Sequence, residues 1–318
     1  MKKGMIFGIV MILIGVIAFG VGFAMINFNF LALNREELKA KEEALSGEFD
    51  RIKLDTGMFD ITLCKSEDEG EAKLVSRESE KIRLTYEIKD GVLTVRAIDE
   101  RQWFEKIGFF FGGYKAELQL PREDYLSLEG NYSTGAIKCE EGLSFGSLDL
   151  SGGTGKAEVY SRVTGDIKIE LTTGDVTVKN QSARTAFIEV TTGNITLSDI
   201  SLSGGLSICA TTGDIRMTNL SAMTVHAENS TGSINADNLK CSGAVAVLLT
   251  TGNCRLERLD ALSCSIDIST GYTYVSLLRG MKIDAESTTG SVRVPEDRGE
   301  ERLYIRSSTG SIDVVYVD

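Results

Sequence analysis

The sequence predicts an all-β fold: a single-stranded β-solenoid with rungs of 19 or 20 residues, preceded by one N-terminal transmembrane helix. The dipeptide Thr-Gly returns every 19 or 20 residues through the second half of the chain. Such a steady period indicates one structural unit stacked on itself. Apolar and polar residues alternate on both sides of Thr-Gly, as in strands with one buried face. The chain also begins with a long uncharged segment.

The uncharged segment runs from Met5 to Ile26 and follows Lys2 and Lys3. It is long enough to span a bilayer, and basic residues on the short side stay in the cytoplasm. We therefore expect a single-pass protein of the cell membrane, with residues 1–4 cytoplasmic, residues 5–26 in the membrane and the rest extracytoplasmic. A cleaved signal peptide is the alternative. The run is long for one and lacks an Ala-x-Ala site, although the sequence leaves open whether it is ever cleaved.

Residues 27–46 are expected to form a juxtamembrane stalk. Charged residues dominate its second half, and Glu37 and Lys41 stand four apart, a spacing that supports a short helix. A solvated linker is the alternative. The remaining residues, 47–318, are expected to form the solenoid, with irregular rungs over 47–134 and regular rungs over 135–318.

The irregular rungs follow the same template less closely. Ile52 to Ile61 fits it, and so does Leu84 to Val95 with Asp-Gly at the corner. The charged segment Lys65 to Glu80 is expected to protrude as a loop. An aromatic loop follows, and it either contacts a membrane or partner or plugs the solenoid core. Its candidate contact residues are Trp103, Phe104, Phe109, Phe110, Phe111 and Tyr114.

In the regular rungs, each Thr-Gly is expected to form the corner between two strands. Glycine turns a corner at low steric cost, and a β-branched threonine suits a pleated surface on which like residues stack. A single rung cannot bury its apolar face alone, so stacking provides the stability. The structural turn residues are Thr173, Gly174, Thr192, Gly193, Thr212, Gly213, Thr231, Gly232, Thr251, Gly252, Thr270, Gly271, Thr289, Gly290, Thr309 and Gly310.

Charge and cysteine content limit the partners. The formal net charge is −12, which disfavours nucleic acid and anionic polymers as ligands. The six cysteines lie at different phases of the repeat and form no ladder, so we expect free thiols that act mostly as small buried hydrophobic residues. No Cys-x-x-Cys or Cys/His spacing suggests zinc, and we expect no metal and no cofactor.

Catalytic residues are scarce. The only histidine, His226, falls at an outward position of its strand, so a histidine-based triad has little to build from. Solenoid glycan lyases and hydrolases need long loops that wall a cleft, and the rungs from Gly155 to Gly290 are nearly free of loops. We therefore expect no catalytic residues and a protein that is not an enzyme, with a glycan-active solenoid as the least favoured alternative.

One outward column contains several carboxylates. It lies four positions before the corner glycines, where an acidic stripe would attract cations or a basic partner. Ordinary solvated surface charge is the alternative, and Cys209 and Leu248 interrupt the stripe. Its acidic members are Glu170, Glu189, Glu228, Asp267 and Glu286.

The chain resembles the bacterial membrane-anchored β-strand-repeat "putative adhesin" family, also called toastrack, a domain of unknown function. The resemblance covers residues 47–318 and rests on Leu118 to Pro121, on Tyr125 to Gly135 and on the Thr-Thr-Gly-Asp-Ile and Ser-Thr-Gly-Ser-Ile units. It implies a right-handed solenoid, an envelope location and an association with cell-envelope stress systems. The family offers no catalytic residues.

We therefore expect a non-enzymatic binding or scaffolding module at the bacterial envelope, with a protein or a surface component as its partner. An accessory of an envelope stress-sensing system, signalling through the anchor, is the alternative. The last strand, Ile312 to Val317, carries no polar cap. It is expected to leave an open solenoid end through which the protein could bind a partner or form a homo-oligomer.

Overall fold

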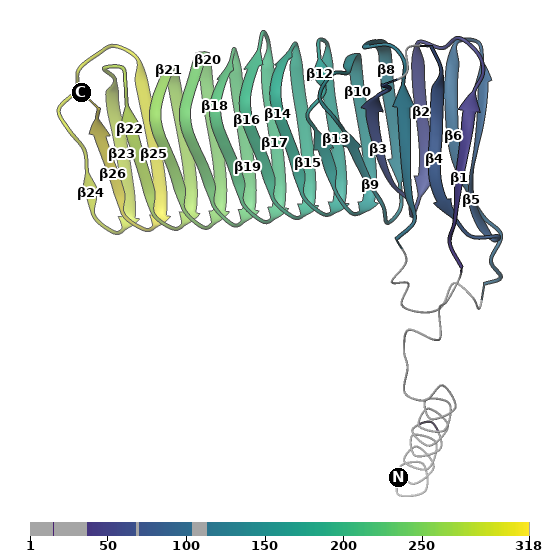
Figure 1. Ribbon diagram of the computed structural model, residues 1–318. Helices are drawn as coiled ribbons and strands as arrows, with labels where there is room; N and C mark the ends of the chain where they lie inside the picture. The colour runs from purple at the N-terminus through teal and green to yellow at the C-terminus, as the bar shows by residue number, and fades with distance from the viewer. Residues whose placement is uncertain (1–14, 16–36, 68–69, 104–112, 318) are drawn as a thin grey trace, which may run out of the picture.

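The computed structural model is an elongated β-solenoid (Figure 1). It describes residue 15 and residues 37–67, 70–103 and 113–317. The predicted membrane span, Met5 to Ile26, lies outside the described residues apart from Gly15. Within the described ranges, no helix combines the length and the apolar character that crossing a membrane requires.

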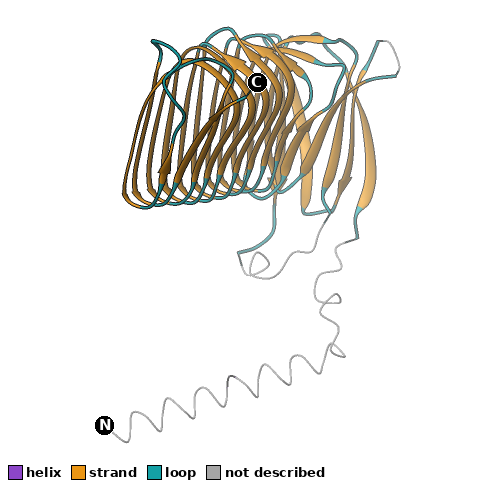
Figure 2. Cartoon of the chain, turned by 90° about the vertical axis from the view of Figure 1, so that its left-hand side faces the viewer, coloured by secondary structure: helices purple, strands orange, loops and turns teal. Residues whose placement is uncertain are grey.

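Each regular rung has a strand that leads to the corner glycine, on what we call side A, and a strand that leaves it, on side B. Neighbouring rungs pair in parallel and in register (Figure 2). Side A contains β10 (Ser144–Thr154), β13 (Asp166–Thr173), β15 (Thr185–Thr192), β17 (Gly205–Thr212) and β19 (Thr224–Thr231). Side B contains β9 (Ala136–Cys139), β11 (Ala157–Val159), β14 (Val176–Ala183), β16 (Ile195–Leu202), β18 (Ile215–Ala222) and β22 (Thr273–Leu277).

Three further strands belong to the regular part. β20 (Ile234–Thr251) and β21 (Cys254–Thr270) each run through side B and on into side A of the next rung. The short β12 (Arg162–Val163) pairs with the start of β10.

The Thr-Gly corners form as predicted. Gly213 has a φ of 134°, a region closed to other residues, and a Cβ there would lie 1.9 Å from the Gly193 carbonyl oxygen. Only glycine lets successive rungs stack so closely. The next residue adds a side-chain ladder, because the Asn194 amide donates to Asp175 Oδ1 at 2.9 Å and the Asp214 amide to Asn194 Oδ1 at 3.0 Å.

A second corner, on side B, was not anticipated from the sequence. One residue per rung adopts a left-handed conformation, which asparagine and aspartate tolerate best. Their side chains form a second ladder, in which Asn219 Nδ2 donates to Asp199 Oδ1 and Asn238 Nδ2 to Asn219 Oδ1, both at 2.9 Å. The residues at this corner are Asn180, Asp199, Asn219, Asn238 and Arg258.

The core is a set of stacked apolar columns. Four of the six cysteines, Cys139, Cys241, Cys254 and Cys264, are buried in it as expected, whereas Cys64 and Cys209 are partly exposed. Ile169, Ile188 and Ile208 are fully buried and lie in one column. Cys254 and Cys264 also occupy core columns, and all six thiols are free. Burial raises the pKa of the Cys254 thiol to about 12, so this group is inert at neutral pH.

The irregular part continues both sides. Side A extends through β8 (Asp124–Tyr132), β2 (Arg51–Gly57), β6 (Val92–Asp99) and β5 (Ile82–Lys89). Side B extends through β3 (Asp60–Lys65), β7 (Lys115–Leu120), β4 (Ala72–Glu78) and β1 (Lys39–Leu45). The parallel template ends here, because β1, β4 and β5 pair antiparallel with their neighbours.

Three sequence-based expectations fail in this part. The stalk is not helical over Lys39–Leu45, which is strand β1 and buries Leu45. The segment Lys65 to Glu80 contains β4, whose alternating residues Ala72 and Leu74 enter the core although charged residues surround them. Asp-Gly at residues 90 and 91 is a tight hairpin turn rather than a coil corner, because both residues have positive φ values, 52° and 75°.

The last two rungs are stacked in inverted order. β25 (Arg302–Thr309) and β26 (Ile312–Tyr316) pair directly with β21 and β22. β23 (Lys282–Thr289) and β24 (Val292–Arg293), which come earlier in the chain, lie outside them and form the end (Figure 1). The expectation that Ile312 to Val317 forms the open end is therefore wrong for side A, where β23 is outermost. On side B, β24 covers this last strand only at Ile312 and Asp313.

The inversion buries the more apolar rung. Leu303 and Ile305 of β25 are fully buried, whereas Ile283 and Ala285 of β23 are only partly buried. A side-chain hydrogen bond also stabilises the inserted rung, since Tyr316 Oη donates to the Met281 carbonyl oxygen at 2.9 Å. A buried isoleucine stabilises a fold by about 1.5–3 kcal/mol more than an exposed one, which favours this order.

Candidate functional site

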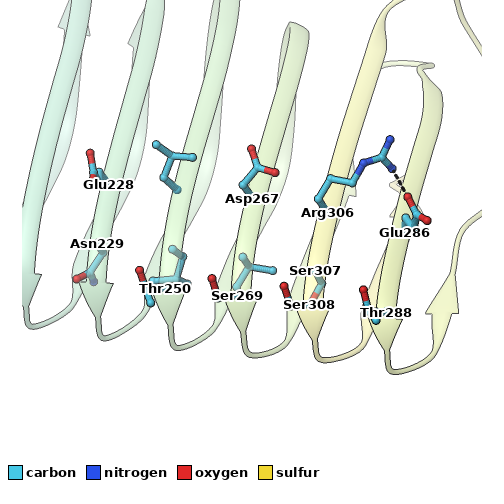
Figure 3. A pocket seen from close by; sticks show the side chains of 13 residues that line it. Glu228, Asn229, Thr250, Asp267, Ser269, Glu286, Thr288, Arg306, Ser307 and Ser308 are labelled. Atoms are coloured by element: carbon cyan, nitrogen blue, oxygen red, sulfur yellow. Dashed lines mark ion pairs between the residues drawn. The ribbon is translucent and has the colours of Figure 1, made fainter.

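Side A carries a shallow groove of about 460 Å³ over its last rungs (Figure 3). Two rows of outward side chains line it. One row, on successive strands, is Glu228, Leu248, Asp267, Arg306 and Glu286. The other is a row of hydroxyls next to the corners: Thr250, Ser269, Ser308 and Thr288. Parallel register places like positions one strand spacing apart, about 4.8 Å, so the groove is regular along the rod.

Arg306 gives the groove mixed charge. Its guanidinium lies 3.0 Å from Asp284 Oδ1 and 3.3 Å from Glu286 Oε2. The hydrogen bond with Asp284 is the main reason that the pKa of Arg306 is raised, so this cation persists at every physiological pH. The inverted rung order sets this pattern, because it places Arg306 between Asp267 and Glu286, which would otherwise be adjacent like charges.

The predicted acidic stripe is one column but not one continuous site. The register brings only Glu170 and Glu189 side by side among its five members. Cys209 and Leu248 separate the next carboxylates, and Arg306 stands before Glu286. In the part of the chain that the structure describes, no three His, Cys, Asp or Glu side chains are grouped so as to hold a metal ion.

Two side chains with potential for catalysis, His226 and Cys64, lie on different sides of the solenoid. His226 lies on the surface, as predicted, with its Nε2 3.9 Å from Glu228 Oε2. A second groove, on side B, contains Cys64. Burial, and then a hydrogen bond to Glu117, raise the pKa of Cys64 to about 12, so it is not a thiolate nucleophile at neutral pH.

The aromatic loop is described only at its two ends. Trp103 is 74% exposed, whereas Tyr114 is buried and packs against Phe59 with 5.3 Å between ring centroids. Tyr114 is thus a core residue, and Trp103 is the described side chain of the loop that a partner could reach. Phe104, Phe109, Phe110 and Phe111 lie outside the described residues.

The fold and these surfaces define a class of protein, an all-β repeat solenoid with long, regular polar faces. The chain belongs to the Toastrack DUF4097 family, whose model matches residues 49–273 and 204–318. No curated protein matches the chain.

Several solved structures resemble the protein at low identity. A "putative adhesin" from Parabacteroides distasonis is 13% identical, with 88% of this chain and 98% of that chain covered and a TM-score of 0.45. A "putative lipid binding protein" from the same species is 13% identical, with coverage of 89% and 98% and a TM-score of 0.44. A "putative adhesin" from Bacteroides fragilis is 13% identical, with coverage of 88% and 98% and a TM-score of 0.39.

Proposed function

We propose that the protein is a non-enzymatic, membrane-anchored β-solenoid that acts as an adhesin-like binding or scaffolding module outside the cytoplasmic membrane of a bacterium. The observation that carries the proposal is the groove on side A. It offers repeated hydroxyls and charges along the rod rather than an enclosed pocket, which suits an extended partner. Membership of the Toastrack DUF4097 family also supports a binding module.

The groove favours a partner with cationic and hydrogen-bonding groups. Three carboxylates line the groove, Glu228, Asp267 and Glu286. Arg306 is the only basic side chain among the residues that line the groove. The hydroxyl row can both donate and accept hydrogen bonds. A segment of an envelope protein that carries lysine or arginine matches this pattern, and the net charge of −12 disfavours a polyanion.

A binding experiment with matched variants tests the proposal. The full chain in detergent is immobilised and used to recover partners from solubilised envelope of the source cells. The groove variant combines E228Q with D267N, and the control combines E158Q with E257Q on side B. We expect a defined partner to bind the wild type and the control equally and to bind the groove variant at least about tenfold more weakly. Equal binding by all three would refute a role for the groove.

The anchor and its orientation need a separate test. The uncharged segment after Lys2 and Lys3 supports an uncleaved span with the solenoid outside. Protease added to intact spheroplasts should then digest the solenoid, and the full-length chain should fractionate with membranes. Protection of the solenoid would contradict the orientation.

A role in envelope stress sensing would act through the span rather than the rod. Replacing residues 5–26 by an unrelated membrane segment separates the two functions. Retained partner binding with normal export supports the module proposed here, whereas a lost stress response with normal export favours the sensing role.

A further inference from the structure

On side A, the solenoid ends in strand β23, which has one unpaired edge. β23 pairs with β25 along one edge, and in the described chain no strand pairs with its other edge. The Lys282 amide donates to Glu301 in the stack, whereas the Ile283 amide points away and donates to Asp297 Oδ1 at 3.0 Å. Because direction alternates along a strand, the backbone groups of Ala285 and Ser287 also face the open edge.

The apolar columns are unfinished at the same end. Val292 and Val294 of the outer rung are 38% and 44% exposed. The corresponding residues of the inserted rung, Ile312 and Val314, are 0% and 4% exposed. On side A, one more strand along β23 would satisfy its outward backbone groups and cover the partly buried Ile283 and Ala285.

We propose that this edge binds a second copy of the chain, with the two β23 strands antiparallel about a two-fold axis at Asp284. The proposal does not rest on the function assigned to the groove, although Glu286 belongs to both surfaces and also lies 3.3 Å from Arg306. In this arrangement Lys282 lies opposite Glu286 of the second copy, and the symmetry repeats the pair. Opposite charges directly across a strand pair stabilise it, and an isologous contact of this kind closes as a dimer.

Charge selects the register. An axis at Ala285 would place Asp284 opposite Glu286 twice, which is repulsive. An axis at Ile283 would move half of the overlap out of β23, since the strand begins at Lys282. An axis at Asp284 keeps residues 282–286 paired within the strand. The two Asp284 carboxylates meet at the axis, but each already binds its own Arg306 at 3.0 Å.

Asp297 competes with the second copy. Pairing about Asp284 makes Ile283 exchange hydrogen bonds with Ala285 of the second copy, so the Ile283 amide must leave the Asp297 carboxylate. The side chain of Asp297 thus covers the edge in the monomer and moves aside in the dimer. Removing it should strengthen self-association.

Charge reversal with mixing tests the register. The mass of the full chain in detergent is measured by analytical ultracentrifugation over a concentration series, and melting by circular dichroism checks each variant's fold. K282E alone and E286K alone should each weaken association at least about tenfold, because both opposite-charge pairs become like-charge pairs. An equimolar mixture of K282E and E286K should restore it, since both cross-strand pairs become complementary. A mixture that stays monomeric, or a wild type that is monomeric throughout, would overturn the proposal.

Backbone variants test the edge itself. Proline at Ala285 removes an amide that faces the open edge and leaves the bonds to β25 in place, so A285P should fold and stay monomeric. A285S keeps the amide and should associate like the wild type. D297A should associate more tightly than the wild type. Undiminished association of folded A285P would show that the contact lies elsewhere and overturn the proposal.

Discussion

Replacing a corner glycine inside the stack should destabilise the solenoid strongly. We consider Gly213→Ala. The φ of 134° is essentially confined to glycine and costs another residue about 1–3 kcal/mol. The new Cβ would also lie 1.9 Å from the Gly193 carbonyl oxygen, so the two rungs must separate at this corner.

Separation weakens nearby hydrogen bonds between rungs. The Gly193 amide donates to the Thr212 carbonyl at 2.8 Å, and the Ile195 amide to the Asp214 carbonyl at 2.9 Å. Each such bond contributes about 0.5–1.5 kcal/mol. Together with the backbone strain, the expected loss in the free energy of unfolding is about 2–6 kcal/mol. Urea denaturation followed by far-ultraviolet circular dichroism measures it.

Two control glycines separate the strain from the contact. Gly70 has a φ of 141° but nothing within 4 Å of an added Cβ, so Gly70→Ala should cost only the strain, about 1–3 kcal/mol. Gly113 has neither feature, and Gly113→Ala should change stability by less than about 1 kcal/mol. A Gly213→Ala loss no larger than that of Gly70→Ala would refute the role of close rung stacking.

Three other perturbations have definite outcomes. Gly290→Ala should destabilise less than Gly310→Ala in urea denaturation, because the outer rung can move away; the reverse ranking would contradict the inverted rung order. Gln181→Leu should lower the free energy of unfolding by about 2–4 kcal/mol. It removes the hydrogen bonds that the Gln181 side chain makes with the Val163 amide, at 2.9 Å, and with the Ser161 carbonyl, at 2.7 Å. As a control, Ser182→Ala at an exposed position should leave the stability unchanged. Burial raises the pKa of Cys139 and Cys254 to about 12. In native protein at pH 8, a thiol reagent should therefore not label these two cysteines until urea unfolds the chain. Prompt labelling of the native protein would contradict their burial.

The regular rungs could be predicted from the sequence because one residue decides each corner. A glycine at positive φ, with a threonine before it and an alternating apolar pattern on both sides, fixes the strand phase and the core columns. The side-B corner was missed because its residue type varies, and Arg258 stands where Asn219 and Asn238 stand in earlier rungs. The asparagines and aspartates one period apart were the available signal.

The irregular part and the end could not be predicted in the same way. In β4 and β1, charged residues mask a strand period that tertiary pairing satisfies. The rung order is ambiguous in sequence because residues 282–293 and 302–314 fit the same template. The signals were weak ones: Ala285 is a poor core residue, and Arg306 stands in a column that is otherwise partly acidic. The charge pattern of the groove could not be predicted either, since the order of Asp267, Arg306 and Glu286 depends on the rung order.

Hydrogen exchange at the end of the rod tests the inverted rung order, because the groove and the self-pairing edge both depend on which rung is outermost. Native-state exchange of the monomer at low concentration, read by mass spectrometry of peptides, compares residues 302–309 with residues 282–289. We expect slow exchange throughout residues 302–309, which pair on both sides, and fast exchange at the outward amides of residues 282–289. Slow exchange in 282–289 with fast exchange in 302–309 would show that the rungs stack in chain order and would contradict the inverted order.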